Sequence, residues 1–123
     1  MAFLELTQVN KAFGSSVAVK DFDLRVERGE FVSFLGPSGC GKTTTLRMIA
    51  GFEQPTSGSI VMDGVDISFT APNARNIGMV FQSYALFPNM TVANNIGFGL
   101  KVAGKAAGEI KTRVTEMLGL IKL

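Results

Sequence analysis

A glycine-rich segment followed by a lysine and two threonines carries the residue types of this chain that can do chemistry. Residues 36–44 read Gly-Pro-Ser-Gly-Cys-Gly-Lys-Thr-Thr. The segment fits the phosphate-loop pattern G-x-x-x-x-G-K-S/T. It combines bare backbone that can approach phosphates, a fixed positive charge, and a hydroxyl that can reach a metal ion, which a bound triphosphate requires together. The segment therefore predicts a nucleotide-binding site.

Each part of the segment has an expected role. The glycines let backbone N–H groups approach the β- and γ-phosphates, and the helix that follows adds its positive end. Lys42 is expected to place its charge at the same phosphates, and the Thr43 hydroxyl is expected to bind Mg2+. Thr44 is expected to bind the α- or β-phosphate. The predicted nucleotide-binding residues of the loop are Gly36, Pro37, Ser38, Gly39, Cys40, Gly41, Lys42, Thr43 and Thr44.

The segments on either side of the loop predict the elements that must position it. Residues 31–35 are nearly all apolar and predict a central strand covered on both faces. A helix is predicted over Lys42–Ala50, with Leu46 and Ile49 on one face and Gly51 ending it. Strand, glycine loop and helix thus follow one another in the order that phosphate binding requires.

Further strands are predicted before and after this unit. Phe22, Leu24 and Val26 alternate with charged residues, which indicates a half-buried strand, and Leu4 and Leu6 suggest a weaker one upstream. Residues 59–67 predict a hairpin, because Asp-Gly accepts the backbone angles of a tight turn. Residues 77–81 predict a second buried strand that ends next to Gln82, where α/β sheets gather ligands.

Two helices are predicted in the last third of the chain. Thr91 is a suitable N-cap for a helix that runs to about Val102. A second helix is predicted from about Glu109, and its apolar face consists of Ile110, Val114, Met117 and Leu118.

Composition limits the classes of function. The 123 residues are 46% hydrophobic and 18% charged, as in a single globular domain. A net charge of +2 with scattered Lys and Arg gives no reason to expect a nucleic-acid partner. The single cysteine, Cys40, supports neither a disulfide framework nor a metal cluster. We expect neither export nor a membrane span, because no basic-then-apolar leader and no stretch near 18 apolar residues occurs.

Hydrolysis needs more than a phosphate cradle. It needs an acidic metal partner and a group that orients the attacking water. The chain has no histidine, and none of its ten acidic residues ends a predicted core strand. The nearest match to an acidic strand, Ile60 to Asp63, is better explained as the hairpin. Nucleotide binding is therefore the safer expectation than turnover by this chain alone.

Two further segments carry a resemblance. Residues 51–58 read Gly-Phe-Glu-Gln-Pro-Thr-Ser-Gly, and residues 75–88 read Arg-Asn-Ile-Gly-Met-Val-Phe-Gln-Ser-Tyr-Ala-Leu-Phe-Pro. With the loop, they make the chain resemble the ATP-binding cassette family, the motor subunits of membrane transporters, over essentially its whole length. The resemblance implies an α/β fold: part of a P-loop NTPase core with an antiparallel β subdomain over about residues 1–90, and the start of a helical subdomain over about 91–123.

The resemblance implies roles for two residues outside the loop. Phe13 corresponds to the aromatic residue, often tyrosine, that stacks on adenine, and Gln82 to the glutamine that reaches the magnesium and the attacking water. The implied cofactors are ATP and Mg2+, with Thr43 and Gln82 as metal ligands and Lys42 and Gln82 as catalytic residues. Without the family, Phe13 would be read as a core residue and Gln82 as a solvated side chain.

Partners are implied as well. Residues 82–91 correspond to the loop that couples nucleotide state to transmembrane permease subunits. Tyr84, Leu86 and Phe87 would form an apolar patch for that partner, and packing under the loop is an equal alternative. Asn94 departs from the family, in which glutamate is frequent. A second ATP-binding subunit is the implied dimer partner, at the cytoplasmic face of the cell membrane.

Three family motifs are absent from the printed sequence: the signature Leu-Ser-Gly-Gly-Gln, the acidic magnesium strand with its catalytic glutamate, and the switch histidine. The resemblance thus implies roughly the first half of the domain, from a subunit that imports polyamines, ferric iron, sulfate or sugars. The alternatives are a non-catalytic ATP-binding or permease-docking module and an inactive gene remnant. A GTPase would need Asn-Lys-x-Asp, and residues 10–13, Asn-Lys-Ala-Phe, lack the aspartate.

Overall fold

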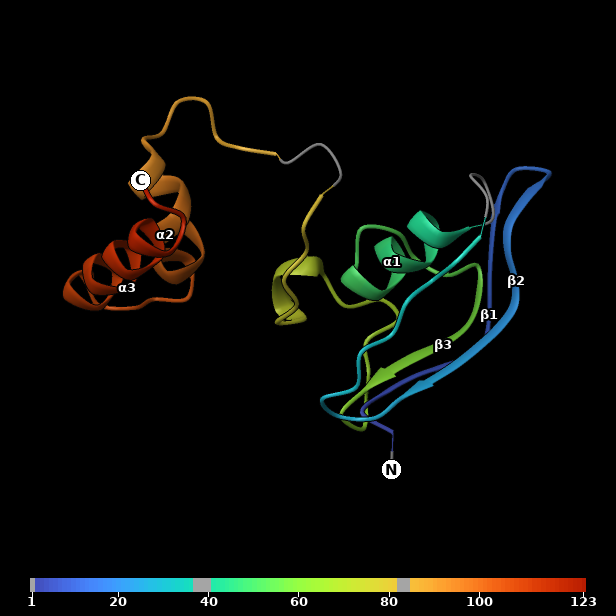
Figure 1. Cartoon of the computed structure of the whole chain (residues 1–123). Helices are drawn as coiled ribbons and strands as arrows, with labels where there is room; N and C mark the ends of the chain where they lie inside the picture. Colours follow the sequence, from blue (N-terminus) through green and yellow to red (C-terminus); the bar gives the residue numbers. More distant parts are fainter. Residues whose placement is uncertain (1, 37–40, 82–84) are drawn as a thin grey trace. The chain divides into compact units, whose positions relative to one another are not determined.

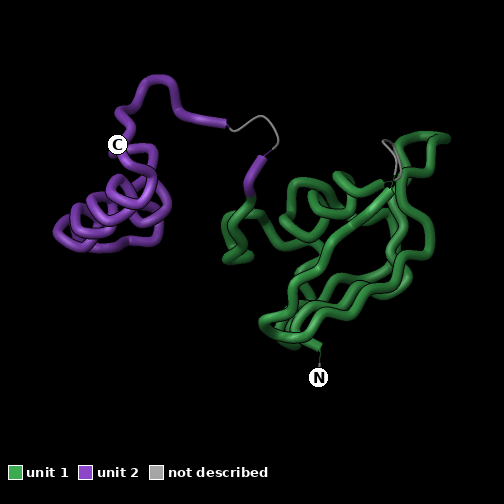
Figure 2. The backbone as a smooth tube through the Cα atoms, in the orientation of Figure 1, with its two compact units in different colours: residues 1–79 green, residues 80–123 purple. Residues whose placement is uncertain are grey.

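The computed structural model describes residues 2–36, 41–81 and 85–123 (Figure 1). The chain forms two compact units, residues 1–79 and residues 80–123 (Figure 2). The first unit contains the sheet and the helix that follows the phosphate loop, and the second contains two helices.

A four-stranded antiparallel sheet forms the frame of the first unit, in the order β2-β1-β3-β4. Its strands are β1 (Leu4–Phe13), β2 (Ser16–Val26), β3 (Ser57–Met62) and β4 (Val65–Asp66). β1 lies in the interior, where Leu6 faces Leu24 on one side and Ile60 on the other. Both predicted N-terminal strands are present, and both are longer than the alternation of apolar residues indicated.

The predicted hairpin is confirmed between β3 and β4. Met62 pairs with Val65, and the two residues between them are Asp63 and Gly64. Their φ angles are 50° and 80°. A two-residue hairpin turn of this type requires a left-handed backbone at both positions, which aspartate tolerates and glycine adopts without strain.

One helix packs on this sheet. Helix α1 (Lys42–Ala50) has the predicted bounds, and Gly51 ends it with φ 97°. Met48 is fully buried in a core with residues from three strands and the segment after β4. Leu46 points elsewhere and is 47% exposed. The core of the first unit comprises Leu6, Val9, Val19, Met48, Ile60 and Ile67.

The prediction of two central strands is wrong for the described residues. Residues 31–35 and 77–81 have no strand structure, and Figure 1 shows the first segment as plain chain leading toward α1. Phe31 is 91% exposed, Leu35 92% and Val80 88%. An apolar run shows that a segment is suited to burial, but a strand also needs a neighbouring strand to accept its backbone hydrogen bonds. The described residues supply no such neighbour to either segment.

The second unit is an antiparallel pair of helices, α2 (Val92–Val102) and α3 (Ala107–Leu120). The predicted N-cap is confirmed, since the Thr91 hydroxyl accepts a hydrogen bond from the Asn94 N–H at 3.1 Å. The second helix begins two residues before the predicted Glu109. Gly97 allows close packing, because a Cβ there would lie 2.9 Å from Ile110 Cγ2. No helix within the described ranges combines the length and apolar character needed to cross a bilayer.

Thr91→Ala is expected to destabilise the second unit by about 1 kcal/mol, because it removes the oxygen that satisfies an N-terminal N–H of α2. Urea unfolding followed by circular dichroism measures this loss. Thr115→Ala is the matched control: Thr115 is exposed within α3, and its hydroxyl only donates to the Lys111 carbonyl of the same helix. Equal losses from the two substitutions would contradict a capping role.

Candidate nucleotide-binding site

The start of α1 lies directly against β2. Gly41 is the N-cap residue of the helix, with φ 90° and ψ 7°. A Cβ at this position would lie 2.5 Å from the Ala18 carbonyl oxygen and 3.1 Å from Val19 Cγ2. Both the backbone angle and the lack of space therefore require glycine, the last glycine of the phosphate-loop pattern.

Gly41→Ala is expected to destabilise the first unit by at least about 1–2 kcal/mol, because alanine disfavours the left-handed backbone at this position. The collision of the new methyl group with the Ala18 carbonyl oxygen adds to this cost. Thermal or urea unfolding checks this value. Gly29→Ala is the control, since Gly29 also has a positive φ of 80° but nothing lies within 4 Å of its added Cβ. The control is expected to lose less stability than Gly41→Ala, and an equal or larger loss for the control would show that contact with β2 is unimportant.

Lys42 joins the two ends of the phosphate loop. Its Nζ donates a hydrogen bond to the carbonyl oxygen of Gly36, the first residue of the pattern. The side chain is half-buried and borders a cavity of about 350 Å3 lined also by Phe22, Ser33 and Thr45. The ammonium group is thus held beside the loop that is predicted to surround the phosphates, which is where a counter-charge to phosphate is useful.

The first turn of α1 suits an anion. Gly41 has no side chain with which to cap the helix, and the first turn contains no acidic residue. The N–H groups there carry the positive end of the helix dipole. Thr43 is exposed, and Thr44 is partly buried. Both hydroxyls stand at the positively charged end of the helix, as a phosphate or metal contact requires.

Thr45 is a site residue that the sequence analysis missed. It is buried, and its hydroxyl donates to the Gly41 carbonyl oxygen at 2.8 Å, beside the backbone bond from Thr45 N–H to the same atom at 2.9 Å. The two bonds hold the first turn of the helix closed. The only sequence signal was its place as the third consecutive threonine.

Five predicted site residues lie outside the described residues: Pro37, Ser38, Gly39, Cys40 and Gln82. Their expected roles stay predictions, as does the pairing of Thr43 with Gln82 at a magnesium ion. Among the described residues, no cluster of three or more His, Cys, Asp or Glu side chains is placed to bind a metal ion.

Phe13 ends β1, opposite Ser16 in the neighbouring strand. Its ring is 48% exposed, and the Lys11 ammonium lies 5.1 Å from the ring centre. Lys11 also pairs with Glu53 at 3.4 Å. Phe13 is not among the residues that line the cavity beside Lys42. The ring is accessible for stacking, and its expected contact with adenine stays a prediction.

The comparison with known proteins identifies the family. The family model described as "ABC transporter" matches residues 19–123. This chain belongs to the ABC transporter family. Curated relatives include the spermidine/putrescine import ATP-binding protein PotA of Thermobifida fusca, which is 56% identical over 98% of this chain. They also include the Fe(3+) ions import ATP-binding protein FbpC of Mannheimia succiniciproducens, 51% identical over 98%.

This ABC family chain spans 32% of the PotA relative and 34% of the FbpC relative. A solved dimeric structure of a bacterial ABC transporter cassette matches with a TM-score of 0.86 and 30% identity, over 98% of this chain and 57% of the cassette. A post-hydrolysis state of that cassette, bound to ADP and Pi, matches with a TM-score of 0.83 over the same shares and at the same identity. The predicted family and the partial P-loop NTPase fold class are confirmed.

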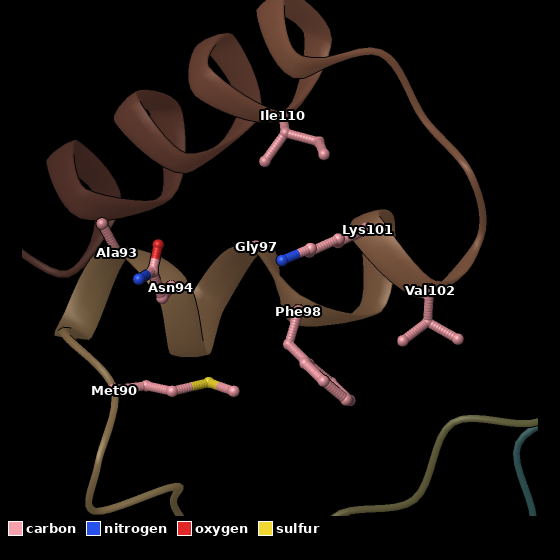
Figure 3. Close-up of a pocket in the computed structure, with 8 residues that line it drawn as sticks. All are labelled: Met90, Ala93, Asn94, Gly97, Phe98, Lys101, Val102 and Ile110. Carbon is pink, nitrogen blue, oxygen red and sulfur yellow. The ribbon is translucent and has the colours of Figure 1, made fainter.

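The second unit of this ABC family chain has an apolar groove of about 430 Å3 (Figure 3). The lining residues are Met90, Ala93, Asn94, Gly97, Phe98, Lys101, Val102 and Ile110. The Phe87 ring packs on Phe98, with centroids 4.6 Å apart, while Leu86 is 76% exposed. Of the predicted apolar patch, Leu86 is therefore on the surface, Phe87 is partly packed, and Tyr84 lies outside the described residues.

The loop before α2 is tied to the helix by one side chain. Asn95 Oδ1 accepts a hydrogen bond from the Phe87 N–H at 2.8 Å. Its Nδ2 donates to the carbonyl oxygens of Phe87 at 3.2 Å and Thr91 at 2.9 Å. Asn95 therefore replaces the hydrogen bonds that this stretch of backbone would otherwise make to water.

Proposed function

We propose that this chain binds ATP together with Mg2+ as the ATP-binding part of an ABC importer subunit. The observation that carries the proposal is the start of α1, where Gly41, Lys42 and Thr43 combine close backbone, positive charge and an exposed hydroxyl. These residues fit a nucleotide phosphate and its magnesium ion. The ADP and Pi bound by the similar cassette support the assignment.

Each residue has a proposed role in this site. The backbone of residues 36–41 and the N–H groups of α1 hold phosphate oxygens, and Lys42 neutralises their charge. Thr43 and Gln82 hold Mg2+, which supplies positive charge at the β- and γ-phosphates when bound. Gln82 also orients the attacking water in the complete protein, and Thr44 binds the α- or β-phosphate. Phe13 stacks on the adenine ring.

The proposed partners follow from the relatives. PotA and FbpC are named import ATP-binding proteins, and the solved cassette is dimeric. We therefore propose that residues 82–91 contact permease subunits at the cytoplasmic face of the membrane, and that a second ATP-binding subunit completes the site. The proposed division is a β subdomain with the phosphate-loop core over about residues 1–90 and the start of a helical subdomain over about 91–123.

Isothermal titration calorimetry of the 123-residue chain with Mg-ATP, ADP, AMP and GTP tests nucleotide binding. ATP and ADP are expected to bind, and AMP is not, because AMP lacks the β-phosphate that the loop surrounds. AMP binding as tight as ATP binding would contradict a phosphate-loop site. A clear preference for GTP would contradict the proposed specificity for ATP.

Phosphate release from ATP tests the second part of the proposal. The chain alone is expected to release no more phosphate than the Lys42→Ala variant, because its sequence offers no acidic strand end and no histidine to activate water. Turnover that depends on Lys42 would show that residues 1–123 contain the whole catalytic apparatus.

A further inference from the structure

A buried arginine holds the C-terminal end of α1. Arg75 is only 4% exposed, and its Nη1 donates to the carbonyl oxygens of Met48 at 2.8 Å and Ile49 at 3.0 Å. Carbonyl groups of a last helical turn lack partners within the helix and carry partial negative charge. A guanidinium group at this end satisfies both needs, and its burial lowers the pKa of Arg75.

The same side chain is anchored to the segment after β4. Arg75 Nε donates to the Thr70 carbonyl oxygen at 2.8 Å, and Nη2 donates to the Ser68 carbonyl oxygen at 3.4 Å. Ser68 is itself buried, and its hydroxyl accepts a bond from the Ile60 N–H at 2.9 Å. Arg75 and Ser68 therefore link the end of α1 to β3, with the Ser68 carbonyl oxygen accepting from Arg75 and its hydroxyl accepting from Ile60.

The packing around Arg75 leaves little room for another arrangement. Gly51, the residue that ends α1, has φ 97°, and a Cβ there would lie 2.7 Å from Arg75 Nε and 3.0 Å from Pro72 Cα. The Gly51 N–H donates to the Arg47 carbonyl oxygen at 2.9 Å. The last turn of α1, Arg75 and Pro72 are therefore held in close contact.

We infer that Arg75 is a positioning residue for the nucleotide, because it clamps one end of the helix whose other end carries Gly41, Lys42 and Thr43. This inference rests on the proposed function. Helix α1 has nine residues and is about 13 Å long, so it moves as one rod. Release of its last turn from β3 lets the rod tilt, which displaces the phosphate-binding residues at its first turn.

The test compares three variants of the 123-residue chain with the unsubstituted chain. Arg75→Met keeps an unbranched, apolar side chain but removes every donor, and Arg75→Lys keeps the charge but loses the planar fork. Val9→Ala is the control, because Val9 is fully buried in the core that also contains Met48 of α1, but its side chain has no polar atom that could donate a hydrogen bond to the end of the helix. The dissociation constant of Mg-ATP is measured at a temperature at which all four proteins are folded. Amide hydrogen exchange of α1 is measured without nucleotide.

Arg75→Met is expected to weaken ATP binding about tenfold, the effect of roughly one well-made charged hydrogen bond, and to speed exchange in the last turn of α1. Arg75→Lys is expected to restore part of both properties, and Val9→Ala is expected to leave ATP affinity unchanged. Unchanged affinity in Arg75→Met, or an equal loss in Val9→Ala, would overturn the inference. Failure of the unsubstituted chain to bind ATP would overturn the proposed function instead, and exchange in α1 would then decide whether the clamp exists.

Discussion

Lys42→Ala is expected to weaken ATP binding by about 10- to 100-fold, because it removes the positive charge that we propose makes charge-assisted hydrogen bonds to phosphate. The side chain already stands at the loop, bonded through Nζ to the Gly36 carbonyl oxygen. Titration calorimetry with Mg-ATP measures the change. The loss should be smaller for ADP, because ADP lacks the γ-phosphate, one of the two phosphates that Lys42 is proposed to contact.

A control variant separates this local effect from a general loss of charge. Lys105→Ala removes the same charge from an exposed residue of the second unit, and it is expected to leave ATP affinity unchanged. Circular dichroism should show that both variants keep their secondary structure. Equal affinity of Lys42→Ala and the unsubstituted chain for ATP would remove Lys42 from the site.

Met48→Ala is expected to cost about 2–5 kcal/mol of stability, since it empties a fully buried position where α1 packs on the sheet. The free energy of unfolding in urea measures this loss. No other described side chain of α1 is as deeply buried. The helix that carries the proposed phosphate-binding residues therefore depends on Met48 for its packing against the sheet.

Leu46→Ala is the matched control, because Leu46 belongs to the same helix but is 47% exposed. It is expected to cost less than about 1.5 kcal/mol, since much of its apolar surface is in water before the change. If the two substitutions cost the same, packing against the sheet would not be what holds α1 in place.

The sequence predicted α1 well because both of its ends have local signals. Gly41 and Gly51 flank the helix, and each has the left-handed backbone that glycine adopts without strain. The β3–β4 hairpin was likewise predictable from Asp63 and Gly64. These elements depend on a few neighbouring residues, so a single sequence contains the information needed to find them.

The features that were missed depend on distant residues. Residues 31–35 and 77–81 have the composition of buried strands, but a strand also requires a partner, which composition does not reveal. Arg75 appeared only as part of a family segment, because its contact with Met48 spans 27 residues. Long-range pairing and buried hydrogen bonds thus mark where prediction from a single sequence stopped.

The candidate site was predictable where it follows a sequence motif and was missed elsewhere. The pattern over residues 36–44 identified Gly41, Lys42 and Thr43, and the structure places these residues together at the start of α1. Thr45 and Arg75 had no motif of their own. They act on the backbone of the helix, by closing its first turn and holding its last, and such roles become visible only in three dimensions.

Asn95 couples the loop before α2 to the helix itself. Its side chain forms hydrogen bonds with the N–H and the carbonyl oxygen of Phe87 and with the carbonyl oxygen of Thr91. These bonds fix the loop to the start of the helix. We therefore expect a displacement of the Phe87 backbone to move the first turn of α2 with it. Asn95→Ala removes these hydrogen bonds and is expected to let the loop move independently of α2.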